Sequence, residues 1–181
     1  MKVLKFGGTS VGSAERMKEV TKLIINNGRK IVVLSAMSGT TNNLVKITEF
    51  LYSQKKESAN NLIDFLEENY SKVINELYTT KESLQEGIEL IDSHFNYLRS
   101  FTQDVFTIHE EKAILAQGEL ISTALFHIYL KEQNIKSDYL QINILEIENK
   151  NIHLNVENIE KSNIYKGEFL LYRELKPGFV G

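Results

Sequence analysis

The sequence has no cysteine and a single proline, Pro177, among its 181 residues. Without cysteine, disulfide frameworks and cysteine-based zinc sites are excluded. The histidines at positions 94, 109, 127 and 153 show no ligand spacing, so we predict no metal site built from side chains. No apolar run approaches the roughly 18 residues that cross a bilayer. We therefore expect a cytoplasmic chain with no membrane partner.

Neither positive nor negative charge is concentrated in one part of the sequence. The 21 Lys and Arg residues are interspersed with 24 Asp and Glu residues, which gives a formal net charge of -3. A protein that follows a phosphate backbone needs clustered basic residues, so nucleic acid is not an expected partner. The hydrophobic share of 42% is enough for this length to bury the core of one domain.

The first part of the sequence predicts a strand, a glycine loop, a helix and a second strand. Val3–Phe6 and Ile31–Leu34 are short apolar stretches that are typical of buried parallel strands. Between them, Ser13–Asn26 has apolar residues at helical spacing, and Gly28 is the expected C-cap.

Helical spacing of apolar residues continues through the middle of the sequence. It predicts helices over residues 44–51, 62–77 and 84–98, and a longer one over Ile108–Gln133. We interpret residues 55–105 as a helical insertion, packed as an antiparallel subassembly against a sheet.

The last part of the sequence is less regular. Tyr139–Ile142 and Phe169–Tyr172 are predicted as short strands. The stretch Glu146–Lys161, rich in Asn, Glu and Lys, has little periodicity and is predicted to be mostly loop.

The glycine loop follows the first strand and precedes the first helix. Lys5 lies at the end of the strand, and Gly7, Gly8, Thr9 and Ser10 follow. Backbone N–H groups at such a junction favour an anion, glycines admit phosphate oxygens closely, and a lysine supplies charge for phosphoryl transfer. The spacing matches neither a Walker loop nor a dinucleotide fingerprint. The alternative is a structural turn with Lys5 in solvent.

Three polar residues form a candidate substrate side. Ser35 and Thr41 follow a buried strand, where open α/β sheets bind ligands, and their hydroxyls suit a carboxylate. The alternative is turn chemistry, with Thr41 capping the second helix. Glu119 lies in an apolar stretch, residues 113–126, where an ionised carboxylate needs a cationic partner. That partner is either a ligand ammonium group or a side chain such as Lys112.

Four segments stand out in order along the chain, namely Lys5–Val11 (KFGGTSV), Val33–Asn42 (VLSAMSGTTN), Gln117–Thr123 (QGELIST) and Pro177–Gly181 (PGFVG). They resemble the motifs of aspartokinases, within the amino-acid kinase superfamily. The resemblance implies an α/β fold, a three-layer αβα sandwich with a mostly parallel sheet. Residues 1–181 would then form part of a kinase domain that carries the helical insertion.

The resemblance also implies an activity. Aspartokinases use ATP, with Mg²⁺ held mainly through the ATP phosphates, to convert L-aspartate to 4-phospho-L-aspartate, the first step towards lysine, threonine and methionine. By resemblance Lys5 is the catalytic residue, the glycine loop binds phosphate, and Ser35, Thr41, Glu119 and Phe179 contact aspartate. Glu119 would pair with the α-ammonium group. A homo-oligomer is implied for the full-length enzyme.

The resemblance is thin over residues 142–175, and the family continues beyond position 181 with a Gly-Arg-Gly-Gly-Ser-Asp segment and the adenine-binding half. We therefore expect this chain alone to be inactive or nearly so, as a fragment of a longer enzyme. Two other functions stay open. One is a non-catalytic binding or assembly module that uses residues 55–105 as a partner surface; the other is a kinase for another substrate, such as glutamate.

Overall fold

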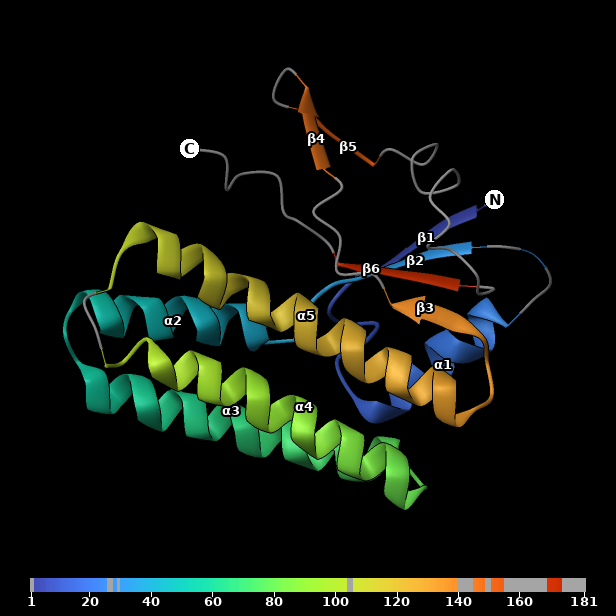
Figure 1. Ribbon diagram of the computed structural model, residues 1–181, viewed down its shortest axis with the longest axis horizontal. Coiled ribbons are helices and arrows are strands. Elements are labelled where there is room, and N and C mark those ends of the chain that lie inside the picture. The colour runs from blue at the N-terminus through green and yellow to red at the C-terminus, as the bar shows by residue number, and fades with distance from the viewer. Residues whose placement is uncertain are drawn as a thin grey trace.

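Five helices and a parallel sheet make up most of the described structure. The computed structural model describes residues 2–25, 28, 30–103, 106–139, 145–148, 151–154 and 169–173. In chain order the elements of Figure 1 are β1 (Lys2–Phe6), α1 (Ala14–Ile24), β2 (Lys30–Leu34), α2 (Thr40–Tyr52), α3 (Lys56–Leu77), α4 (Lys81–Ser100), α5 (Ile108–Glu132), β3 (Ser137–Tyr139), β4 (Leu145–Glu148), β5 (Asn151–Leu154) and β6 (Phe169–Arg173).

The main sheet has the strand order β1-β2-β6-β3, and all its neighbouring strands are parallel. Helix α1 connects β1 to β2, and helices α2 to α5 connect β2 to β3. Both connections step across the sheet in the same direction. Because such crossovers are right-handed, they place their helices on the same face, and Figure 1 shows α1 and α5 on one side of the strands.

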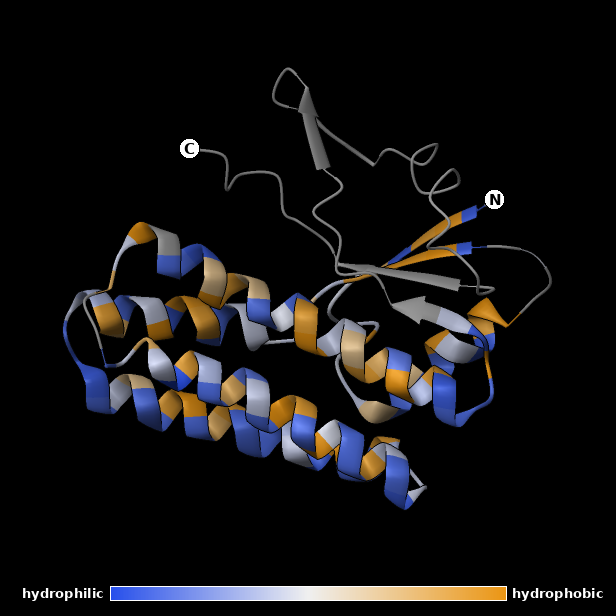
Figure 2. Cartoon of the chain, in the orientation of Figure 1, coloured by the Kyte–Doolittle hydropathy of each residue, from blue (hydrophilic) through white to orange (hydrophobic). Residues whose placement is uncertain are grey.

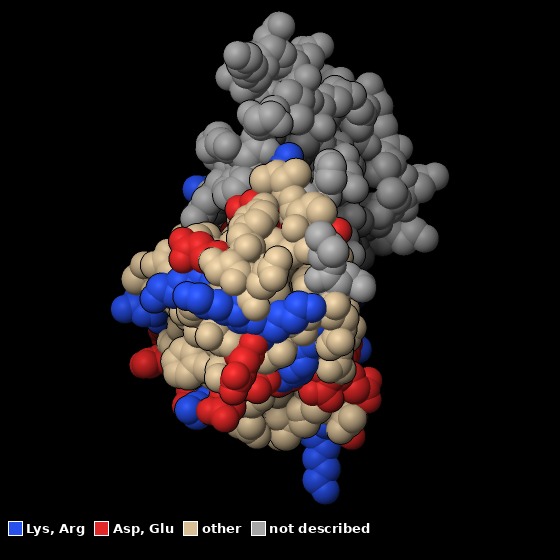
Figure 3. All heavy atoms as spheres, turned by 90° about the vertical axis from the view of Figure 1, so that its left-hand side faces the viewer, with Lys and Arg blue, Asp and Glu red and all other residues tan. Residues whose placement is uncertain are grey.

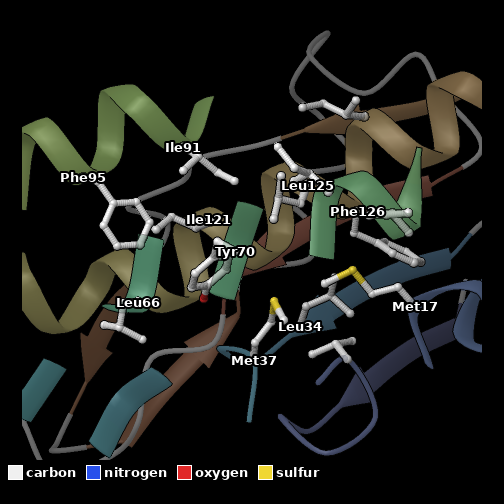
Figure 4. Close-up of a cluster of buried hydrophobic side chains, with 14 of the residues drawn as sticks. Met17, Leu34, Met37, Leu66, Tyr70, Ile91, Phe95, Ile121, Leu125 and Phe126 are labelled. Carbon is white, nitrogen blue, oxygen red and sulfur yellow. The ribbon is translucent and has the colours of Figure 1, made fainter. Parts of the chain in front are cut away.

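The core lies between this face and the helices. Val32 and Leu34 of β2 are fully buried and join one apolar cluster with Met17 of α1 and Phe126 of α5. Figure 4 shows Met17, Leu34 and Phe126 pointing towards one another. The alternation of β2 therefore fixes which side of the sheet receives the helices.

Helices α3 and α4 form an outer layer that packs against α2, α5 and α1. Each has a buried stripe at intervals of three or four residues, and Figure 2 shows orange positions alternating with blue ones along both helices. The buried apolar residues of the two stripes are Ala59, Ile63, Leu66, Tyr70, Ile74, Leu77, Ile91, Phe95 and Leu98. The predicted helices are found, but the prediction that they pack against the sheet is wrong, because α3 and α4 pack mainly on α1, α2 and α5.

Tyr78, which follows α3, holds the outer layer to α5. Its hydroxyl donates a hydrogen bond of 2.8 Å to the carbonyl oxygen of Leu125. Its ring lies where a side chain at position 87 would be, because a Cβ added to Gly87 would meet the Tyr78 ring at 2.5 Å. Burial raises the pKa of Tyr78, so its hydroxyl stays protonated and donates.

The predicted strands and helices are found, with corrections at their ends. Helix α1 ends at Ile24 with Ile25 as its C-cap, so the prediction of Gly28 as the cap is wrong, although Gly28 does adopt a positive φ of 109°. The strand predicted over Tyr139–Ile142 begins earlier, because β3 covers Ser137–Tyr139, and its later residues lie outside the described part.

The prediction that Glu146–Lys161 is mostly loop is wrong for its first part. Strands β4 and β5 pair antiparallel there, with Glu146 opposite His153. Apolar and polar residues alternate within each short strand, as Leu145 and Ile147 show, but four residues are too few for that alternation to stand out.

The α/β class, the mostly parallel sheet and the helical insertion are confirmed. Among the described residues, the helices of the main crossovers cover one face of the sheet, so the described part shows two of the three layers of the expected sandwich. Figure 3 shows Lys and Arg side chains beside Asp and Glu over the ends of α2 to α5, so this face has no single sign of charge.

Within α5, the stretch Glu110–Glu132 is long and apolar enough to cross a membrane by length and composition. The prediction that no stretch qualifies is therefore too strict. However, 67% of its most apolar window is buried inside the protein, as in the core helix of a folded domain.

Candidate functional site

Glycines bring the loop after β1 against the loop after β2. A Cβ added to Gly8 would lie 2.6 Å from the carbonyl oxygen of Ala36, and one added to Gly12 would lie 3.0 Å from Cβ of Ser38. Any side chain at Gly8 would push against backbone, which cannot rotate away. These two glycines therefore let the loops pack in direct contact.

Helix α5 packs against the β2–α2 loop at a third glycine, Gly118. A Cβ added to Gly118 would lie 2.8 Å from Cβ of Ala36 and 3.1 Å from Cγ2 of Thr40. One turn further along, the Ser122 hydroxyl donates a hydrogen bond of 2.8 Å to the carbonyl oxygen of Ser35. The glycine loop, the β2–α2 loop and the middle of α5 thus converge beyond the tips of β1 and β2.

The glycine loop is anchored on one side and open on the other. Val11 is fully buried, and the backbone N–H of Ser10 donates to the carbonyl oxygen of Gly7 at 2.8 Å, which closes a turn. Gly7 and Thr9 are exposed, and a Cβ added to Gly7 would meet nothing within 4 Å. The open side leaves room for an anion at Gly7.

Lys5 and Glu119 approach the strand tips from different sides of the sheet. Leu4 and Phe6 of β1 pack against the core, so alternation places the exposed Lys5 on the opposite face. Glu119 belongs to α5, on the helical face. A ligand that touches both must therefore lie across the tips of β1 and β2.

Ser35 is fixed from both sides. Its backbone N–H donates a hydrogen bond of 3.1 Å to the carbonyl oxygen of Phe6, which extends the pairing of β1 with β2. Its own carbonyl oxygen accepts from Ser122. The residue is 8% exposed, and the hydrogen bonds described for it use its backbone N–H and carbonyl groups.

Thr41 lies in the first turn of α2 and is half-buried. The helix begins at Thr40, its N-cap is Gly39 with φ 82° and ψ -19°, and no side chain caps it. The alternative in which Thr41 caps the helix is therefore wrong. A glycine suits this cap because a side chain would be strained at positive φ.

Glu119 is 6% exposed, deep in the apolar part of α5. Its carboxylate is close enough to the Tyr70 phenol to act on it: burial raises the pKa of Tyr70, and the negative charge of Glu119 raises it further. The alternative partner, Lys112, is exposed and forms no ion pair with Glu119 among the described contacts. The alternative pairing of Glu119 with Lys112 is therefore wrong.

The sequence profile of the amino acid kinase family matches residues 1–177. The chain belongs to the amino acid kinase family. It is 33% identical over 141 residues to aspartokinase 2, chloroplastic, of Arabidopsis thaliana, a match that covers 72% of this chain and 24% of that protein. It is 27% identical to lysine-sensitive aspartokinase 3 of Escherichia coli, over 77% of this chain and 30% of that protein. The resemblance to aspartokinases is confirmed.

Solved structures show the same fold. The chain superposes on E. coli aspartokinase III in complex with lysine and aspartate with a TM-score of 0.73 and 22% identity, over 96% of this chain and 40% of that chain. For the complex of the same enzyme with aspartate and ADP the TM-score is 0.65 at 20% identity. The chain thus spans about a quarter to two fifths of the length of these relatives.

Two hydrogen bonds next to the site of this amino acid kinase were not foreseen from its sequence. Thr40 Oγ1 and the Tyr70 hydroxyl lie 3.0 Å apart, both buried. His94 Nδ1 and Gln117 Oε1 lie 2.6 Å apart. Periodicity places these residues on buried or half-buried helix faces, but it does not say which polar atoms meet. Phe179, the remaining predicted substrate contact, lies outside the described residues.

Proposed function

We propose that this amino acid kinase chain forms part of the site of an ATP-dependent kinase that phosphorylates the side-chain carboxylate of L-aspartate. The observation that carries the proposal is the convergence of the glycine loop, the β2–α2 loop and the Gly118–Glu119 turn, in which Glu119 is buried. The aspartokinase relatives, and the aspartate and ADP named for a solved neighbour, support the choice of substrates.

The glycine loop is the proposed phosphate side. Gly7 is exposed and has no neighbour that a ligand would have to displace, which fits a close approach of phosphate oxygens to backbone N–H groups. Lys5, together with Thr9 and Ser10, would stabilise the charge of the transferred group. Mg²⁺ would be held mainly through the phosphates and would neutralise their charge.

The substrate side needs no general base. A carboxylate oxygen of aspartate is already a nucleophile; it forms a bond to the terminal phosphorus of ATP while the bond to the ADP oxygen breaks, giving 4-phosphoaspartate and ADP. Glu119 would bind the α-ammonium group, and the hydroxyls of Ser35 and Thr41 would orient a carboxylate. Phe179 stays a proposed pocket residue.

The proposal extends to the setting of the reaction. A phosphoaspartate-forming enzyme stands at the start of the route to lysine, threonine and methionine, and a cytoplasmic homo-oligomer is proposed for the full-length enzyme. Residues 1–181 would supply part of the kinase domain, and this chain alone is expected to have little or no activity.

Calorimetric titration of the 181-residue chain tests the substrate side. We expect L-aspartate to bind at least ~10-fold tighter than succinate, which lacks the ammonium group and so cannot form a charged hydrogen bond with the Glu119 carboxylate. Glu119→Gln should remove this preference, whereas Lys112→Gln, its matched control on α5, should keep it. Equal affinity for the two acids would contradict the assigned role of Glu119. A defined oligomer that gives no signal with aspartate or ATP would instead favour the assembly module.

Trapping of the acyl phosphate by hydroxylamine tests the reaction in a chain extended past Gly181. The extended enzyme should form aspartyl hydroxamate from L-aspartate and ATP, and Lys5→Ala should lower kcat by at least ~100-fold. Lys2→Ala, an exposed lysine of the same strand, is the control and should change little. Preference for L-glutamate would move the proposal to the other amino acid substrate.

A further inference from the structure

Helices α3 and α4 contain no predicted substrate residue, yet one of their side chains reaches the converging loops. Tyr70 of α3 is 2% exposed and points into the buried cluster that also holds Phe95, Ile121 and Met37, as Figure 4 shows. Its ring lies 5.7 Å from that of Phe95, in a tilted arrangement. The ring is therefore held by the helical layer, while its hydroxyl extends towards α2.

The partner of the Tyr70 hydroxyl is Thr40, the first residue of α2. The two oxygen atoms lie 3.0 Å apart, and Thr40 is 4% exposed. Both groups are removed from water, so each depends on the other for its hydrogen bond. Thr40 directly precedes Thr41 in the first turn of α2, so the position of Thr40 helps to set the position of Thr41.

The other branch of Thr40 faces α5. Its Cγ2 would lie 3.1 Å from a Cβ added at Gly118, the residue before Glu119. One side chain therefore uses its hydroxyl to bind α3 and its methyl group to pack against α5. A β-branched residue is stiff about χ1, so fixing the hydroxyl also fixes the methyl group.

We propose that Tyr70, acting through Thr40, is a positioning residue that holds the first turn of α2 against the Gly118–Glu119 turn of α5. The inference rests on the proposed function in one respect, namely that these turns bind the substrate. Tyr70 is not a catalytic residue, because its hydroxyl is used by Thr40.

The chain offers a matched control in Tyr78, which is also buried, at 5% exposure. Its hydroxyl likewise makes one described hydrogen bond, to the carbonyl oxygen of Leu125, farther along α5 than Glu119. Tyr70→Phe and Tyr78→Phe each delete one buried hydroxyl from the same helical layer. A merely structural loss would affect both variants alike.

Hydrogen exchange of backbone amides tests the positioning role. The variants are compared under conditions that give them equal free energies of unfolding. Tyr70→Phe should raise the exchange rate at least ~10-fold over residues 118–121 and 41–44, because a local contact is lost, whereas Tyr78→Phe should raise the rate near Tyr129 instead.

Thr40→Val should give the same exchange pattern as Tyr70→Phe. Thr40→Ser, which keeps the hydroxyl, should exchange at rates closer to those of the parent at residues 41–44. The double variant Tyr70→Phe/Thr40→Val should be no worse than either single one, since both delete the same bond.

Titration with L-aspartate forms the second arm. Tyr70→Phe and Thr40→Val should weaken binding by ~5-fold or more, and Tyr78→Phe by less than ~2-fold. If Tyr70→Phe and Tyr78→Phe give the same exchange pattern, the positioning role is overturned whether or not aspartate binds. If the patterns differ as expected but the parent chain binds no aspartate, the positioning role stands and the proposed function is what fails.

Discussion

The outer helices and the loops at the strand tips are built in opposite ways. Helices α3 and α4 bury large side chains at regular intervals, whereas the loops meet through half-buried glycines, small residues and backbone atoms. In the helices, stability comes from apolar area, and each position tolerates a similar residue. In the loops, close backbone contact leaves no space for a side chain at two glycines. Substitutions in the two regions should therefore destabilise the protein for different reasons: loss of buried apolar area in the helices and steric clash with the backbone in the loops.

The largest expected effect lies in the helical layer. Phe95 is 1% exposed, so Phe95→Ala should lower the free energy of unfolding by about 3–5 kcal/mol, through lost burial and the cavity left behind. Phe65 of α3 is 52% exposed and is the matched control, with an expected loss under about 1 kcal/mol. Urea unfolding measures both. Similar losses for the two variants would contradict the claim that buried apolar area stabilises these helices.

The sequence predicted this layer well, because its stripes run over several turns. Leu66, Tyr70 and Ile74 recur at helical intervals, and no other pattern fits so long a stretch. The short β4–β5 hairpin was missed for the opposite reason, since each strand has only four residues. Element length decided how much of the fold could be predicted.

The next effect distinguishes two adjacent glycines. Gly8→Ala should cost about 1–3 kcal/mol, because its Cβ would lie 2.6 Å from the carbonyl oxygen of Ala36. Gly7→Ala should change the free energy of unfolding by less than about 0.5 kcal/mol, because the added Cβ meets nothing within 4 Å. Thermal and urea unfolding of both variants checks this. A destabilised Gly7→Ala with an unaffected Gly8→Ala would reverse our view of which side of the loop is packed.

The smallest effect concerns a polar link between the outer layer and α5. Partial burial of Glu132 acts to raise its pKa, but hydrogen bonds from Thr79 and Thr80 outweigh it, and the pKa falls below its usual 4.5. A lowered pKa in the folded state stabilises the fold above the usual value and loses that contribution as the pH falls through the folded pKa. Glu132→Gln should therefore cost about 1 kcal/mol at pH 7 and less below about pH 4.

Unfolding followed across pH checks this prediction. Lys131→Gln is the control, because the ion pair of Lys131 with Glu86 is exposed and should contribute under about 0.5 kcal/mol. A cost of Glu132→Gln that does not change between pH 7 and pH 3 would contradict a role for its charge.

The candidate site could be predicted only in part. Motifs identified the segments that converge, and Ser35, Thr41 and Glu119 lie on them. The sequence did not show that Gly8, Gly12 and Gly118 are packing glycines, because a glycine in a motif looks the same whether it faces a ligand or a neighbouring backbone. Nor did it show the bond between Thr40 and Tyr70, since residues far apart in the sequence meet only when the helices have packed.

Two antiparallel helices can slide past each other by one turn, about 5.4 Å, and still bury similar stripes. Tyr78 prevents this slippage, because its ring fits only over the bare backbone at Gly87 while its hydroxyl is tied to Leu125. A one-turn shift of α3 would also carry Tyr70 away from Thr40. The Tyr78 ring over Gly87 thus sets the register of the α3–α4 hairpin, and this register determines whether Tyr70 can reach Thr40 at the start of α2.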